Sequence, residues 1–148
     1  MSDKSYDEFK TVLEEKVDKT FILIEASLNG LEEYRLDYIY SPKELEPYDA
    51  LCDRFIRCVE VFIKYFKAYE YQNFADKSLT LRDGLNVMEK VGLVTNSPIW
   101  MRMRDVRNRI VHDYLPEQTK EMFDSIMGEF YEELKFSKAK IDALSRTN

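Results

Sequence analysis

The stretch that decides the fold is YDALCDRFIRCVEVFIKYFKAYEY, residues 48–71. Apolar side chains recur in it every three or four positions, a spacing that places them on one face of an α-helix. That face is wide, and it comprises Leu51, Cys52, Phe55, Ile56, Val59, Phe62, Ile63 and Phe66. A helix with so broad an apolar face needs several neighbours to cover it. We therefore predict that residues 48–71 form the central and most buried helix of a bundle.

A second apolar stripe precedes this helix. Over residues 6–30 it consists of Phe9, Leu13, Val17, Phe21, Ile24 and Leu28, again at helical spacing, and it predicts a long amphipathic helix. Between residues 31 and 46 the pattern loosens, and Pro42 and Pro47 punctuate the chain. We predict a loop there, with some extended or helical-turn character, and the sequence gives it no role.

Three further helices are predicted after residue 71. A short one through Leu81, Leu85 and Met88 should follow Thr80 and stop at Gly92. Ser97 resembles an N-cap with Pro98 at the first helical position, so the next helix should run from there to about residue 113. The last helix should start at Pro116 and reach about residue 144, because Met122, Phe123, Ile126, Met127, Phe130, Leu134 and Ile141 keep the helical spacing.

The length and composition indicate one domain. A chain of 148 residues is the usual size of a single core, and 4 Gly and 4 Pro leave few places for turns. The expectation is an all-α fold, an up-and-down bundle of four to five helices over residues 1–148.

No apolar run is long enough to span a bilayer, and the N-terminal sequence MSDKSYDEFK lacks the apolar core of a signal peptide. The protein should therefore be cytoplasmic. Cys52 and Cys58 lie six residues apart on the predicted central helix, so they point in different directions. We interpret them as reduced core thiols and expect neither a metal nor a cofactor.

The charge is acidic overall and basic in one place. A formal net charge of −6 argues against a protein that coats nucleic acid through bulk charge. The segment MRMRDVRNR, residues 101–109, nevertheless holds Arg102, Arg104, Arg107 and Arg109 against Asp105 alone. Any contact with nucleic acid should therefore be local to this segment.

His112, the only histidine, follows the arginine segment. A histidine in the last turn of a helix is commonly explained by the helix dipole, and arginines on an exposed helix are usually a solvated face. Arg107 and His112, five residues apart, are separated by roughly 140° around an ideal helix. They would converge only through fraying of the helix end or through a second subunit.

The residues RNRIVHDY, 107–114, resemble the R-x4-H-x-Y motif of HepT-like proteins, members of the HEPN family of helical ribonucleases, in which Asn commonly follows the Arg. The match covers Arg107, Asn108, His112 and Tyr114. The motif lies late in a helix before the last long helix, which is where the family carries it.

The resemblance implies a metal-independent endoribonuclease that acts as a toxin on tRNA or mRNA, with Arg107, Asn108 and His112 as catalytic residues. His112 would transfer protons, Arg107 would hold the phosphate, and Asn108 would orient the backbone or the histidine. HEPN proteins typically form homodimers with facing motifs, so two copies of His112 would supply an acid and a base. Which copy plays which part is left open. Arg102, Arg104 and Arg109 would bind RNA.

The resemblance also implies a partner. HepT-like toxins are usually encoded beside a minimal nucleotidyltransferase antitoxin, which silences them by attaching AMP to the motif tyrosine, here Tyr114. Two other hypotheses stay open. One is a non-catalytic substrate-binding partner of a nucleotidyltransferase, which binds a nucleotide without cleaving RNA, and the acidic net charge favours it slightly. The other is a purely structural helical dimer, in which substitution of His112 would alter neither RNA cleavage nor nucleotide binding.

Overall fold

The computed structural model describes residues 3–74, 77–111 and 115–147, and every regular element in these ranges is helical. The elements are α1 (Asp3–Leu28), α2 (Pro42–Asn73), α3 (Leu81–Lys90), α4 (Ser97–Val111), α5 (Pro116–Ser125), the π-helical turn η1 (Ile126–Phe130) and α6 (Tyr131–Thr147). The predicted all-α bundle is confirmed. No helix in these ranges is both long and apolar enough to cross a membrane.

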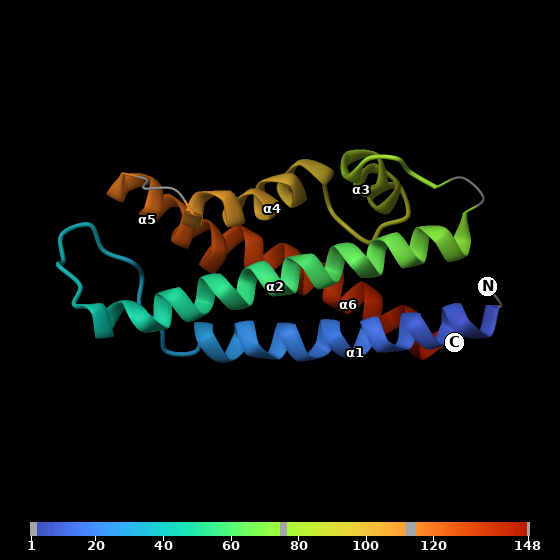
Figure 1. The fold of residues 1–148 in the computed structure, drawn as a ribbon, viewed down its shortest axis with the longest axis horizontal. Coiled ribbons are helices and arrows are strands. Elements are labelled where there is room, and N and C mark those ends of the chain that lie inside the picture. Colours follow the sequence, from blue (N-terminus) through green and yellow to red (C-terminus); the bar gives the residue numbers. More distant parts are fainter. Residues whose placement is uncertain (1–2, 75–76, 112–114, 148) are drawn as a thin grey trace.

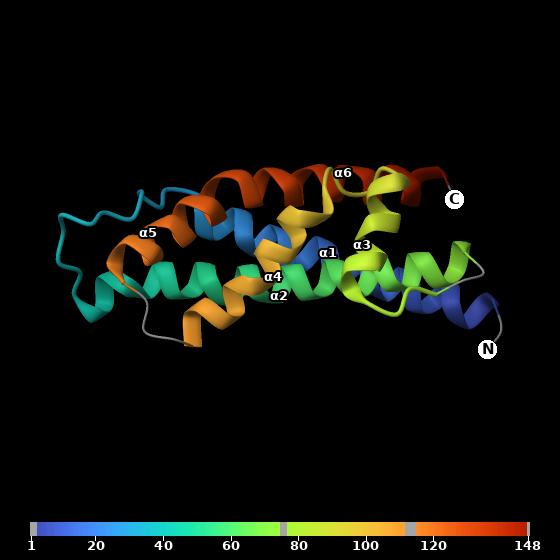
Figure 2. The same cartoon turned by 90° about the horizontal axis from the view of Figure 1, so that it is seen from above.

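α2 lies at the centre of the bundle. α1 packs antiparallel along one side of it, while α3 and α4 cover another side, and α6 lies beside α1 (Figure 1; Figure 2). α2 supplies more buried side chains than any other described element, which confirms the prediction for residues 48–71. Its rings stack into the core: Phe55 on Phe130, with centroids 5.7 Å apart, and Phe62 against Trp100, also at 5.7 Å. These contacts join α2 to η1 and to α4.

α2 begins at Pro42, so the predicted loop over residues 31–46 is wrong for its last five residues. Ser41 and Glu44 form a reciprocal cap. The Glu44 N–H donates to Ser41 Oγ at 3.2 Å, and the Ser41 N–H donates to Glu44 Oε1 at 3.0 Å. Pro42 takes the first helical position, where a missing N–H costs nothing, and Pro47 lies inside the helix. The two prolines predict a break in the helix, but the cap formed by Ser41 and Glu44 starts the helix at Pro42.

The rest of this segment is a loop held down by aromatic rings. The Tyr34 ring stacks on Tyr40 at 4.9 Å between centroids and packs against Phe123 of α5 at 5.0 Å. Lys120 of α5 reaches back to the loop, where its Nζ lies 2.6 Å from Glu33 Oε1 and 3.1 Å from the Tyr34 carbonyl oxygen. The loop is therefore fastened to the helix that follows the RNRIVHDY motif.

The ends of the other helices fit the predictions closely but not everywhere. Thr80 caps α3, accepting the Asp83 N–H at 3.1 Å, and Gly92 has a φ of +83°, so this helix starts and stops as predicted. For α4 the predicted N-cap is wrong by one residue. Asn96 is the cap, because its Oδ1 accepts the Ile99 N–H at 2.9 Å, while the Ser97 hydroxyl donates to Asn86.

The last helix starts at Pro116 as predicted and continues through η1 and α6 to Thr147. Its π-helical turn was not foreseen. The described ends of the chain, at the start of α1 and the end of α6, lie at one end of the bundle, whereas the end of α4 and the start of α5 lie toward the other (Figure 1).

Candidate phosphate-binding groove between α2 and α4

The arginine segment lies on α4, and two of its arginines, Arg104 and Arg107, line a groove of about 490 Å³ between the exposed edges of α4 and α2. The apolar face of α4 turns inward as its spacing predicts: Met103 and Val106 are each 1% exposed. The polar side chains are thereby directed to the rim of the groove. Apolar side chains from both helices form its floor, namely Ile56, Val59, Ile63, Met101 and Met103.

The groove walls carry more positive than negative charge. Among the described residues, its cationic side chains are Lys64, Lys67, Arg104 and Arg107, against the two carboxylates of Glu60 and Asp105. Arg104 and Arg107 come from α4, and the lysines come from α2. A groove lined by lysines and arginines above an apolar floor can bind phosphate groups, with guanidinium groups binding two oxygens at once.

Arg107 spans the groove. Its Nη1 lies 2.9 Å from Glu60 Oε1, and both side chains are largely exposed, at 70% and 47%. Exposed ion pairs contribute little to stability, about 0–1 kcal/mol. A phosphate can therefore displace Glu60 from Arg107 at small cost.

Asp105 organises the neighbouring polar groups of α4. Its Oδ1 accepts a hydrogen bond from Asn108 Nδ2 at 3.1 Å, and its Oδ2 lies 3.6 Å from Arg109 Nε. Asn108 lines the groove beside Arg107, whereas Arg109 lies outside it. The structure therefore brings together Arg104, Arg107 and Asn108 of the predicted site residues and leaves Arg109 apart from them.

Arg102 lies on another face of α4. It forms an ion pair with Glu129 at 2.6 Å, and its guanidinium lies over the Phe130 ring at 5.3 Å from the centroid. Both partners belong to η1, so Arg102 links α4 to the π-helical turn. The predicted role of Arg102 in binding RNA gains no support from this position.

Two predicted site residues, His112 and Tyr114, lie outside the described residues. The last described residue of α4, Val111, directly precedes His112 in the sequence.

The contribution of α2 to the groove was not anticipated from the sequence. Glu60, Lys64 and Lys67 follow one another at intervals of four and three residues, so they share one face of α2. That spacing is visible in the sequence, but it does not reveal which helix the face meets.

The two cysteines are buried in α2, and burial raises the pKa of each thiol to about 12. Both thiols are therefore protonated at neutral pH. Among residues 3–74, 77–111 and 115–147, no group of three or more His, Cys, Asp or Glu side chains is placed to hold a metal ion.

Comparison with known families adds one finding. Residues 15–143 match the family described as nucleotidyltransferase substrate binding protein like. The chain belongs to this family. No curated protein and no solved structure matches it.

The substrate-binding-like region includes both walls of the groove, because α2 and α4 lie within residues 15–143. The family name connects the chain with a nucleotidyltransferase, and the family includes the HepT-like HEPN toxins that the RNRIVHDY motif resembles.

Proposed function

We propose that this member of the nucleotidyltransferase substrate-binding-like family is a metal-independent endoribonuclease, the toxin of a toxin–antitoxin pair, and that the α2–α4 groove binds the phosphates of its RNA. One observation carries the proposal: Arg107 and Asn108, which precede His112 by five and four residues, line a cationic groove. This position supports the phosphate-binding role that the motif implies for the Arg107 guanidinium.

The chemistry requires two proton transfers. A base removes the proton from the 2′-OH, the oxygen attacks the adjacent phosphorus, and the bond from phosphorus to the 5′-oxygen breaks as an acid protonates that oxygen. An imidazole with a pKa near 6.5 serves either role at neutral pH. In a homodimer with facing motifs, two copies of His112 supply both groups, and Arg107 stabilises the charge of the pentacoordinate phosphate.

The groove also suits the regulation that the motif implies. AMP attached to the Tyr114 hydroxyl by a nucleotidyltransferase antitoxin adds a phosphate two residues beyond His112. That phosphate would compete with RNA for Arg107 and its neighbours. Silencing would then be both electrostatic and steric.

The family match favours a second candidate function. A substrate-binding partner of a nucleotidyltransferase would use the same cations to hold a nucleotide for its partner and would not cleave RNA. It shares the phosphate site with the first proposal and differs in the role of His112.

The deciding experiment incubates purified protein with total RNA in excess EDTA and analyses the products for 2′,3′-cyclic phosphate ends. We expect wild type to cleave, and His112→Ala and Arg107→Ala to lose at least about a hundredfold in rate. Arg35→Ala is the matched control, because Arg35 also pairs with a carboxylate at 2.9 Å and is exposed, but does not line the groove.

Equal cleavage by wild type and both site variants would overturn the assignment. Nucleotide binding without any RNA turnover, from protein shown by mass to carry no AMP, would select the substrate-binding partner instead.

A further inference from the structure

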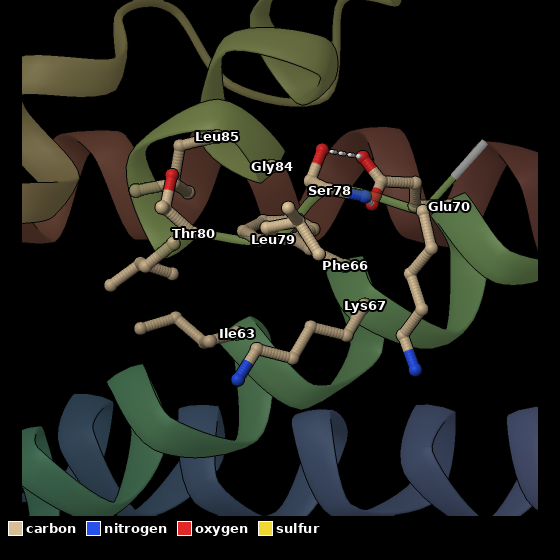
Figure 3. Close-up of a pocket in the computed structure, with 11 residues that line it drawn as sticks. Ile63, Phe66, Lys67, Glu70, Ser78, Leu79, Thr80, Gly84 and Leu85 are labelled. Carbon is tan, nitrogen blue, oxygen red and sulfur yellow. Dashed lines mark hydrogen bonds between the residues drawn. The ribbon is translucent and has the colours of Figure 1, made fainter.

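A second pocket, of about 300 Å³, lies between the C-terminal half of α2 and the segment that leads into α3 (Figure 3). We propose that it binds an unpaired nucleobase, one that carries an exocyclic amino group, of the RNA or nucleotide whose phosphates bind the α2–α4 groove. The link to the groove rests on the proposed function, whereas the pocket itself can be tested separately.

The pocket and the groove share part of their lining. Ile63 and Lys67 line both, so the two cavities are neighbours along one face of α2. Figure 3 shows the Lys67 side chain running along the rim past Ile63 rather than into the pocket. Its ammonium group is therefore available to a phosphate between the two cavities.

The walls of the pocket suit a flat, apolar ring. They are formed mainly by Phe66, Leu81 and Leu85 together with Ile63. Leu79, which is 97% exposed, also lines the pocket and can cover a ligand. A volume near the lower end of the usual range for ligand sites, about 300–1,000 Å³, fits a single base rather than a larger ligand.

A buried carboxylate supplies the polar selectivity. Glu70 is 4% exposed yet lines the pocket, and it accepts the Ser78 N–H and the Ser78 hydroxyl, each at 2.8 Å (Figure 3). A carboxylate has about four acceptor positions, so Glu70 retains capacity for the amino group of a base. The Thr80 hydroxyl, whose oxygen accepts the Asp83 N–H, lies at the other end of the pocket and can donate to a ring nitrogen (Figure 3).

Two lysines complete the site. Lys67 at the shared rim and Lys77, whose Nζ lies 5.5 Å from the centroid of the Tyr71 ring, both line the pocket, so an anion attached to the base meets positive charge where it leaves the pocket. An apolar slot with an internal acceptor and external cations matches a nucleoside phosphate. A neutral apolar ligand would form no ionic interaction with the two lysines.

The test measures binding of AMP, adenosine and ribose 5-phosphate by titration calorimetry at low ionic strength. Contacts with one base contribute about 1–3 kcal/mol, so AMP should bind about 5- to 150-fold more tightly than ribose 5-phosphate. Inosine 5′-monophosphate, which has a carbonyl in place of the amino group, should bind more weakly than AMP, because the Glu70 carboxylate repels it.

Gly84→Leu provides the blocking variant. Gly84 lines the pocket, and a Cβ there meets only Ser78 Cβ, at 3.8 Å, which is ordinary van der Waals contact, so we expect the rest of the leucine side chain to occupy the pocket. It should abolish the advantage of AMP over ribose 5-phosphate. Gly128→Leu is the control, because Gly128 is also helical, lines neither cavity and has open space at its Cβ.

Leu79→Ser is a second variant that an exposed position should tolerate, and it should weaken AMP and adenosine severalfold. Ile39→Ser, at a position that is 95% exposed in the other loop, is its control and should bind as wild type does.

Equal affinities for AMP and ribose 5-phosphate in wild type, or an unchanged AMP affinity in Gly84→Leu, would overturn the base pocket. If wild type binds adenosine, Gly84→Leu does not, and the protein cleaves no RNA, the base pocket would be supported and the proposed ribonuclease activity would be rejected. RNA cleavage that depends on Arg107 but is unaffected by Gly84→Leu, together with equal AMP and ribose 5-phosphate binding, would support the ribonuclease and reject the base pocket.

Discussion

Arg107 of α4 and Glu60 of α2 form an ion pair at 2.9 Å across the candidate groove, joining residues that are 47 positions apart in the sequence. The pair neutralises the cation that the RNRIVHDY motif assigns to the phosphate. Glu60 therefore competes with any phosphate for the guanidinium.

Glu60→Gln should strengthen RNA binding. Removing the carboxylate frees Arg107 and takes one negative charge out of the groove, and an exposed pair of this kind contributes about 0–1 kcal/mol, so affinity should rise up to about fivefold. Binding of a short single-stranded RNA by fluorescence anisotropy measures it. Asp53→Asn, which removes an α2 carboxylate paired with Arg57, is the control. Weaker binding by Glu60→Gln would show that Glu60 holds Arg107 in its working position.

Glu133→Ala should destabilise the fold. Glu133 is 4% exposed, and it accepts the Trp100 indole N–H at 2.8 Å and the Thr95 N–H at 2.9 Å. The buried Trp100 indole N–H left without a partner costs about 1–3 kcal/mol, whereas the N–H of Thr95, an exposed residue, can bond to water, so we expect a loss of about 1–3 kcal/mol. Urea unfolding followed by the fluorescence of Trp100 gives the value. Glu132→Ala, at the exposed neighbouring position, should change stability by less than about 0.5 kcal/mol.

The thiols of Cys52 and Cys58 should resist alkylation in the folded protein. Burial raises the pKa of each to about 12, so at pH 8 only about one thiol in ten thousand is ionised, and the thiolate is the reactive form. Reaction with iodoacetamide, followed by mass spectrometry, should be slow in buffer and rapid in denaturant. Fast modification of the folded protein would mean that this part of α2 opens readily.

The pKa of Glu33 reports whether the aromatic loop is fastened to α5. The hydrogen bond and the charge of Lys120 lower the pKa of Glu33 below its usual value, and Glu33 in turn raises the pKa of Lys120. The favourable interaction is present above the unfolded pKa of Glu33 and is lost as the pH falls through its lowered folded value. Lys120→Gln should therefore raise the pKa of Glu33 in an NMR titration. Lys43→Gln should leave it where it is in wild type, and an unshifted value in Lys120→Gln would mean that the contact does not form in solution.

The sequence predicted those parts of the fold that depend on local spacing. The stripe from Leu51 to Phe66 identified the buried helix, and the Thr80 cap and Gly92 set the limits of α3. The start of α2 was missed because a proline can either break a helix or open one, and only the cap between Ser41 and Glu44 decides between them.

The candidate site was predictable on one side only. Helical spacing places Arg104 and Asn108 on one face of α4. It does not predict that this face lies opposite Glu60, Lys64 and Lys67 of α2. That choice depends on how two helices distant in sequence pack. The π-helical turn at Ile126–Phe130 was equally hidden, because its apolar residues continue the spacing of an ordinary α-helix.

The described ends of α1 and α6 lie on opposite sides of the same end of the bundle, away from the end of α4 (Figure 1; Figure 2). An affinity tag, a fluorescent reporter or a surface-immobilisation linker joined beside the start of α1 or the end of α6 would therefore be held away from the described end of α4. Labelled protein should behave as the unlabelled chain does in every assay of the groove.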